Sequence, residues 1–306
     1  MVLYEVFSHS IKKRYKTSIF TKASIIQLLS IVLTYLSPFL IAYFTGGFWI
    51  KEKAFTETPD IKFQYRYIAI LEGESNLYIS SSYESINQIY QNEYRSSVRI
   101  INELDTDDDG FPDLLEFNLL ISGVPIDTIT NVKLMLLFNS TISVISNLKL
   151  ESVGFFESYN SRKYTELSFD AELAFVQREK LREQVTYNGY SYQMLNETNI
   201  DLEELNLDKI IRDYSSREFS TRLVTDYVSW KNSLAEGFKI NAYIRYVPFK
   251  LDYIPAFWQQ FKWGWIQYIS ILIPFIFVFR TIKVFIFENQ LVPTICVNTS
   301  QKMKTS

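Results

Sequence analysis

The sequence predicts a mainly β domain, similar to an antiparallel β-sandwich, inserted between two transmembrane α-helices. Two stretches without charged side chains predict the helices: residues 23–50 and residues 263–279, which are 28 and 17 residues long. About 20 apolar residues cross the hydrocarbon core of a bilayer. Between these stretches, apolar residues alternate with polar ones over several short segments, and this period of two is typical of half-buried strands.

The composition excludes several classes of protein. The chain has 306 residues, of which 47% are hydrophobic and 21% charged, and its net charge is -3. It is too apolar for a disordered chain and not basic enough for a general nucleic-acid binder. The single cysteine, Cys296, and the single histidine, His9, rule out an internal disulfide, a cysteine–histidine zinc cluster and most histidine-based triads. No spacing of the other reactive residues marks a catalytic site, so we expect neither an enzyme nor a small-molecule substrate.

The first apolar stretch is expected to be an uncleaved anchor, because 22 residues precede it and no small-x-small cleavage site follows it. The second stretch extends to residue 287 if Arg280 and Lys283 reach the membrane surface with their long side chains. The expected organisation is an N-terminal tail (1–22), a first span (23–46), an outer β-rich domain (47–262), a second span (263–287) and a C-terminal tail (288–306).

The tails carry positive charge. Residues 1–22 hold five basic residues and one acidic residue, and residues 280–306 hold four and one. Because the whole chain has a net charge of -3, the segment between the spans is acidic. Short basic segments stay on the cytosolic side of a membrane. We therefore expect both termini in the cytosol, where they would meet anionic lipid or cytosolic partners, and the middle segment outside.

Six segments of the middle region show the alternation of a strand with one wet face. They are residues 62–67, 115–121, 131–138, 141–150, 167–175 and 238–246. Strands of this kind with short polar links favour an antiparallel sandwich. Residues 85–94 and 202–227 are instead expected to be helical or irregular, and the last strand is expected to run nearly straight into the second span.

An acidic loop is the strongest local motif. Residues 105–116, DTDDDGFPDLLE, match the calcium-binding pattern D-x-D-x-D-G with Asp in the ninth position and Glu in the twelfth. The flanking segments look like strands, and Pro112 is unusual for an EF-hand, so we favour a strand-loop-strand calcium cage. A solvated acidic turn is the alternative. The expected ligands are the carboxylates of Asp105, Asp107, Asp109 and Asp113 and the carbonyl of Phe111, with Glu116 the weakest candidate because it would point to solvent.

Two asparagines in the middle segment lie in N-glycosylation sequons. Asn139 begins Asn-Ser-Thr and Asn196 begins Asn-Glu-Thr. Asn298 begins a third sequon, which the expected topology leaves in the cytosol and unmodified. Cys296, just beyond the second span, could be palmitoylated, although an unmodified thiol is the expected state.

Several segments resemble the transmembrane protein 231 family. The resemblance lies in LYEVFSH (3–9), FWIK (48–51), DTDDDGFPDLLEF (105–117), INAYIRY (240–246) and the block from FWQQFKWGWIQYISILIPFIFVF to IKVFIFENQ (257–290). It covers both ends, both spans and the acidic loop, but not residues 127–235. The order of aromatic residues in the last block is its most specific part.

The resemblance implies a non-enzymatic scaffold subunit of the ciliary transition-zone (MKS, or tectonic-like) complex. That family acts in cilium assembly, in the diffusion barrier that controls the membrane proteins of the cilium, and in Hedgehog-type signalling. The implied location is the ciliary membrane at the transition zone. The implied partners are B9-domain proteins, tectonics and other transition-zone membrane proteins, together with the lipid bilayer.

Other function classes fit the layout less well. The main alternative is an accessory or chaperone subunit of a membrane transporter such as a lipid flippase, but the outer domains of those proteins carry disulfides. A trimeric two-span channel is disfavoured because no polar pore-lining pattern appears in the spans. A membrane-tethered hydrolase lacks a candidate catalytic constellation.

Overall fold

The computed structural model describes residues 13–46, 48–125, 128–192, 195, 207–232 and 236–298. The chain divides into two compact units. We call residues 1–51 together with 257–306 the membrane hairpin, and residues 52–256 the β domain.

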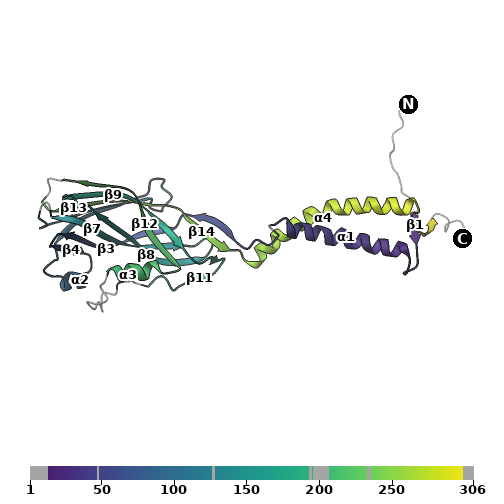
Figure 1. Cartoon of the computed structure of the whole chain (residues 1–306), viewed down its shortest axis with the longest axis horizontal. Coiled ribbons are helices and arrows are strands. Elements are labelled where there is room, and N and C mark those ends of the chain that lie inside the picture. The colour runs from purple at the N-terminus through teal and green to yellow at the C-terminus, as the bar shows by residue number, and fades with distance from the viewer. Residues whose placement is uncertain are drawn as a thin grey trace, which may run out of the picture. The chain divides into compact units, whose positions relative to one another are not determined.

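The membrane hairpin contains two long helices, α1 (Lys22–Phe44) and α4 (Phe257–Glu288), which run side by side (Figure 1). Both are long and apolar enough to cross a bilayer. Large apolar side chains such as Leu36 and Phe277 are exposed on them. A helix satisfies its own backbone hydrogen bonds, so an apolar helical surface of this kind is suited to lipid. The two predicted helices are therefore confirmed.

A short two-stranded ribbon lies at the end of the hairpin where α1 begins and α4 ends. Strand β1 (Lys13–Lys16) pairs antiparallel with β15 (Ile295–Asn298), so that Tyr15 is opposite Cys296. The sequence pattern predicts two separate tails here, and the structure joins them through backbone hydrogen bonds.

The β domain contains two five-stranded sheets and one three-stranded sheet (Figure 1). The first sheet has the order β11 (Thr186–Tyr187), β8 (Asn147–Tyr159), β7 (Ile129–Ile142), β3 (Asp60–Gly73) and β4 (Leu77–Ser81). The second has the order β12 (Phe219–Lys231), β9 (Glu166–Gln177), β13 (Phe238–Tyr246), β6 (Leu114–Ile121) and β5 (Ser97–Leu104). The third has the order β10 (Leu181–Arg182), β14 (Phe249–Ile254) and β2 (Lys53–Glu57). Two short helices, α2 (Glu84–Ile89) and α3 (Leu207–Ser215), complete the domain.

The two five-stranded sheets pack on one shared apolar core. Phe63 of the first sheet and Phe117 of the second have ring centroids 5.9 Å apart. Phe156 of the first and Phe169 of the second stack with centroids 3.8 Å apart. Burial of many aromatic and aliphatic side chains between two sheets supplies the main stabilisation of such a domain. This arrangement confirms the predicted sandwich and explains how a domain without cysteine is held together.

The sandwich departs from the prediction in the direction of one strand pair. Strand β13 runs antiparallel to β6 but parallel to β9. The reason lies in β12, which comes later in the chain than β9 and pairs antiparallel with one edge of it. The chain then turns into β13, which lies on the other edge of β9 and so runs in the same direction as β9. The short pairs β10–β14 and β11–β8 are also parallel. The sheets are therefore mixed rather than wholly antiparallel.

The predicted strand over residues 141–150 is only partly correct, because a turn interrupts it. Strand β7 ends at Ile142 and β8 begins at Asn147, with a turn between them. The carboxylate of Glu57 accepts hydrogen bonds from the backbone N–H groups of Ser143 and Val144, at 2.8 and 2.9 Å. A side chain distant in sequence thus stabilises a turn within a run that alternates like a strand.

Residues 202–227 are also only partly as predicted. Helix α3 lies within this range, but Phe219 begins the long strand β12. Most of β12 beyond its first three residues is exposed, and a bulge lies between Thr225 and Tyr227, so its sequence lacks a clean alternation. A further strand, β14, separates β13 from α4 along the chain, whereas the prediction ran the last strand into the second span.

Candidate metal site and membrane hairpin

The acidic loop connects two neighbouring antiparallel strands. Strands β5 and β6 pair up to Leu104 and Leu114, which are opposite each other, and residues 105–113 form the loop between them. The main chain of Asp113 closes the loop, since its N–H donates to the Leu104 carbonyl at 2.8 Å. The setting is therefore strand-loop-strand, as the flanking sequence predicts.

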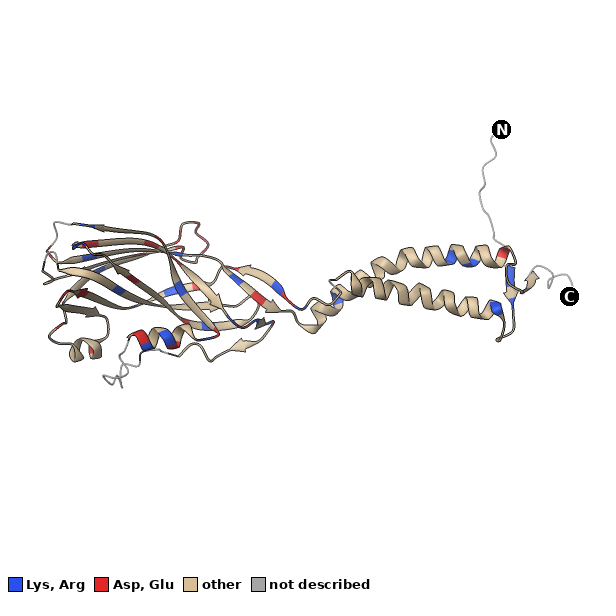
Figure 2. Ribbon diagram, viewed as in Figure 1, with Lys and Arg blue, Asp and Glu red and all other residues tan. Residues whose placement is uncertain are grey.

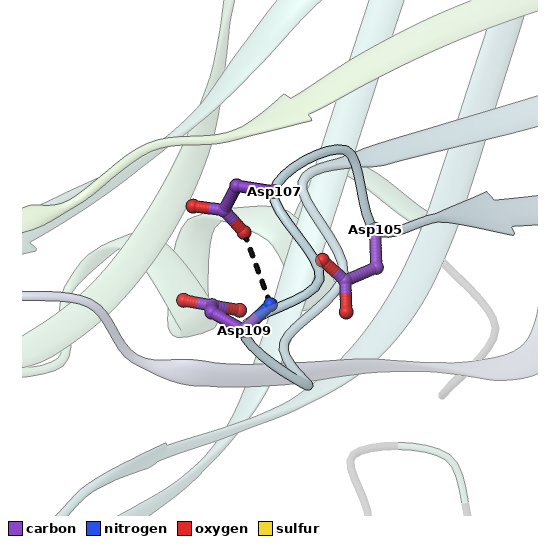
Figure 3. Close-up of side chains that lie close together, drawn as sticks. All are labelled: Asp105, Asp107 and Asp109. Atoms are coloured by element: carbon purple, nitrogen blue, oxygen red, sulfur yellow. Dashed lines mark hydrogen bonds between the residues drawn. The ribbon is translucent and has the colours of Figure 1, made fainter.

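Three of the predicted ligands converge in this loop. One carboxylate oxygen from each of Asp105, Asp107 and Asp109 lies within 4.8 Å of the others (Figure 3). Among the residues that the structure describes, this is the one group of acidic, histidine or cysteine side chains close enough to share a metal ion. Calcium takes six to eight oxygen ligands, so these three would supply part of its shell and the loop carbonyls or water the rest.

Hydrogen bonds within the loop hold these aspartates in position. The N–H of Gly110 donates to Asp105 Oδ2 at 2.9 Å, and the N–H of Asp109 donates to Asp107 Oδ1 at 3.3 Å. The N–H of Phe111 donates to Asp109 Oδ1 at 2.8 Å. Gly110 has a φ of 88°, which favours glycine. The motif spacing thus produces a tight turn that directs alternate carboxylates to one side.

The remaining predicted ligands lie differently. Asp113 Oδ2 accepts a hydrogen bond from the N–H of Thr106 at 2.8 Å, and Asp113 is not within the group of three. Glu116 lies on β6, where its carboxylate is 3.5 Å from Asn102 Nδ2 on the adjacent strand. The side chain of Phe111 is partly exposed. The structure therefore brings together three of the five carboxylates.

The surroundings of Asp107 raise its pKa above the ordinary value. Loss of contact with water is the largest cause, and repulsion by Asp109 is the next; a hydrogen bond from the Asp109 N–H opposes them. Like charges held this close disfavour full ionisation, and a bound cation would reverse that effect.

The glycosylation sites divide between described and undescribed parts of the chain. Asn139 is exposed on strand β7, and its side-chain oxygen accepts a hydrogen bond from Gln64 Nε2 at 2.6 Å. Asn196 lies outside the described residues.

The membrane hairpin has two chemically distinct ends. Near the start of α4, an aromatic pocket of about 420 Å³ is lined mainly by Phe39, Phe48, Trp49, Phe261, Trp265 and Tyr268. At the other end, next to β1, basic residues gather (Figure 2). The pairing of β1 with β15 joins the two ends of the chain next to the basic residues of α4. Sequence reasoning missed it because no local pattern marks a pair of strands separated by almost the entire chain.

These features define the class of protein: a membrane protein with two candidate spans and a β-sandwich between them in the sequence. The family model of transmembrane protein 231 matches residues 1–296. The chain is 33% identical to transmembrane protein 231 of Xenopus tropicalis over 299 residues, which cover 96% of each chain. It is 32% identical to the mouse (Mus musculus) protein over 310 residues, covering 98% of this chain and 97% of that one, and 31% identical to the human (Homo sapiens) protein over 307 residues, covering 99% and 97%. The chain belongs to the transmembrane protein 231 family.

A comparison with solved structures found a proton-activated chloride channel at 9% sequence identity. The alignment covers 87% of this chain and 97% of that chain, with a TM-score of 0.26. No conclusion about fold or function follows from a similarity at this level.

Proposed function

We propose that this protein is a non-enzymatic membrane scaffold subunit of the ciliary transition-zone complex. In this role it acts in cilium assembly and in the barrier that controls which membrane proteins enter the cilium, and it supports Hedgehog-type signalling. The observation that carries the proposal is the match to the family over residues 1–296, which includes both membrane helices and the whole β domain.

The proposed topology has both termini in the cytosol and the β domain outside. The distribution of charge in the membrane hairpin supports it. At the β1 end, the described residues include six basic side chains and one acidic side chain: Lys13, Arg14, Lys16, Lys22, Arg280, Lys283 and Glu288. Short segments rich in Lys and Arg are retained on the cytosolic side during insertion.

The fold suggests how such a subunit would work. The hairpin anchors the chain, and the sandwich presents a rigid surface to the outer domains of other membrane proteins. The proposed partners are tectonics and other transition-zone membrane proteins outside, B9-domain proteins in the cytosol, and the bilayer itself. The sandwich has a continuous apolar core, so its outer faces can serve as contact surfaces without loss of the fold.

We also propose that the acidic loop binds calcium and that Asn139 is glycosylated. The grouped carboxylates of Asp105, Asp107 and Asp109 support the calcium site, and the exposure of Asn139 supports the glycan. Calcium binding and glycosylation both fit the extracytosolic side, where calcium is abundant and glycans are added. The Phe111 carbonyl is a further proposed ligand, whereas Asp113 lies outside the group of three and its Oδ2 accepts a hydrogen bond from the N–H of Thr106. Glu116 stays on its strand.

Localisation tests the main proposal. The protein, tagged at its C-terminus and expressed in ciliated cells of its own species, is expected to form a ring just above the basal body. Proximity labelling from the same tag is expected to recover other transition-zone proteins. A matched control carries Lys149→Ala, which should leave the fold and the ring intact because this side chain is exposed on β8. Signal spread over the plasma membrane or endosomes, with no transition-zone protein recovered, would contradict the proposal.

A further inference from the structure

The ribbon formed by β1 and β15 places lysines from the two ends of the chain around one pocket. Alternation along β1 puts Lys13 and Tyr15 on the same face. The ring of Tyr15 lies against Phe287 of α4, with centroids 6.0 Å apart. Lys283 precedes Phe287 by four residues and therefore lies on the same face of the helix. Strand pairing and helix periodicity together bring Lys13 close to Lys283.

The pocket has a size and charge that suit a phosphorylated headgroup. Its volume is about 390 Å³, and its lining includes Lys13, Tyr15, Gln27, Lys283 and Glu288. Ligand pockets of small molecules begin at about 300 Å³. Two lysines face one glutamate at the pocket, and the exposed Arg14, Lys16, Lys22 and Arg280 lie on the same strand and helices outside its lining. Basic side chains therefore outnumber acidic ones at the pocket and on the elements that carry it.

The surroundings of the pocket indicate a lipid rather than a soluble anion. Ile19 and Phe20, between β1 and α1, are 79% and 97% exposed, and Ile295 on β15 is 71% exposed. Apolar side chains next to clustered cations are typical of a segment that lies at the membrane surface. They would enter the acyl boundary while the lysines meet headgroups.

We propose that this pocket binds the phosphate-monoester headgroup of an inositol phospholipid. A phosphate monoester carries about -1.5 to -2 charges at neutral pH, more than a single serine headgroup offers, and two converging lysines match it as point charges. The inference rests on the proposed topology for its biological setting, because such lipids lie in the cytosolic leaflet. The binding itself is a property of the purified chain and is measured without reference to topology or cilia.

Native mass spectrometry of the full-length protein in detergent tests this proposal. The probes are a short-chain phosphatidylinositol bisphosphate, phosphatidylserine and phosphatidylcholine with the same chains, and the soluble inositol trisphosphate headgroup. The expected order of affinity is inositol bisphosphate lipid above phosphatidylserine above phosphatidylcholine. The soluble headgroup is expected to bind more weakly than the lipid, because it lacks the acyl contacts.

Substitutions locate the site. Exchange of Lys13 and Lys283 for Ala is expected to weaken binding of the bisphosphate lipid roughly thirtyfold, from about 1 kcal/mol for each basic residue near the headgroups. Exchange of the same residues for Arg should restore most of the affinity. The matched control is Lys51→Ala with Lys262→Ala, since both are exposed lysines of the same unit outside the pocket.

Three results would overturn the proposal. The first is equal affinity for the bisphosphate lipid and phosphatidylserine, which would reduce the site to a general basic surface. The second is an equal loss of affinity for the bisphosphate lipid in the control variant. The third is a soluble headgroup that binds as tightly as the lipid, which would assign the pocket to a free phosphate. None of these outcomes would affect the ciliary localisation, and a diffuse localisation would not affect the lipid measurement.

Discussion

The hydroxyl of Tyr246 donates a hydrogen bond to the carboxylate of Glu103, with the oxygens 3.1 Å apart. The same Glu103 oxygen accepts a hydrogen bond from the N–H of Phe63 at 3.0 Å. Tyr246 and Glu103 belong to the second sheet and Phe63 to the first, so one carboxylate joins the two layers of the sandwich. Burial raises the pKa of Tyr246 above its ordinary value, and the charge of Glu103 raises it further.

This contact predicts a specific loss of stability in alkali. The folded-state pKa of Tyr246 lies above the unfolded value of about 10. The stabilisation that protonated Tyr246 gives to the fold is therefore complete below pH 10 and falls as the pH rises from there. Tyr246→Phe is expected to cost about 1 kcal/mol at neutral pH from the lost hydrogen bond. Its free energy of unfolding should then decline less steeply than that of the wild type above pH 10. Denaturant unfolding of the full chain across this range measures both slopes, and parallel curves would contradict the assignment.

Calcium should raise the melting temperature of the full chain. The expected cause is binding to the folded acidic loop but not to the unfolded chain, which stabilises the fold by mass action. Exchange of Asp105, Asp107 and Asp109 for Asn should abolish the rise. Glu116→Gln should preserve it, because Glu116 lies on strand β6 outside the grouped carboxylates. Calorimetry in millimolar calcium is the measurement, and an unchanged melting temperature in the wild-type protein would refute the site.

The same site should weaken as the pH falls. Protons compete with the metal for carboxylates, and the raised pKa of Asp107 means that this competition begins at a higher pH than for an ordinary aspartate. The apparent calcium affinity of the wild-type chain should therefore decline on acidification from neutral pH. Isothermal titration at several pH values measures this, and an affinity that stays constant down to the ordinary range of aspartate titration would contradict it.

The centre of the sandwich should depend on the stacked pair Phe156 and Phe169. Phe169 is fully buried, and its ring stacks on Phe156 with centroids 3.8 Å apart. Phe169→Ala is expected to destabilise the chain by about 3–5 kcal/mol through lost burial and a residual cavity. Val144→Ala, at a turn residue that is 65% exposed, should change stability by less than about 0.5 kcal/mol. Denaturant unfolding measures both changes. An equal change in the free energy of unfolding for the two variants would show that Phe169 is not part of the core.

Much of this architecture follows from local pattern. The apolar runs predict α1 and α4 because no other element requires so many consecutive uncharged residues. The alternation in residues 115–121 predicts β6, and the structure buries every apolar residue on the inward face of that strand. The motif spacing also predicts the convergence of Asp105, Asp107 and Asp109, since the three residues lie within one short loop.

The errors arise where distant residues decide the structure. The turn after Ile142 is stabilised by Glu57, a residue too distant in sequence to enter a prediction made from residues 141–150 alone. The parallel pairing of β9 with β13 depends on the path of the chain through β12. The ribbon of β1 and β15 joins the two ends of the chain, so the pocket between Lys13 and Lys283 appears only in the folded hairpin.

The single cysteine offers the most direct test of the central claim that the chain forms a hairpin with both termini in the cytosol. Cys296 is exposed on strand β15. After hydroxylamine treatment to remove any thioester, a membrane-impermeant maleimide should label it only in permeabilised cells. A Cys296→Ser chain that also carries Val144→Cys, in the β domain, should instead be labelled in intact cells. Labelling of Cys296 in intact cells, or protection of the introduced thiol until permeabilisation, would contradict the account.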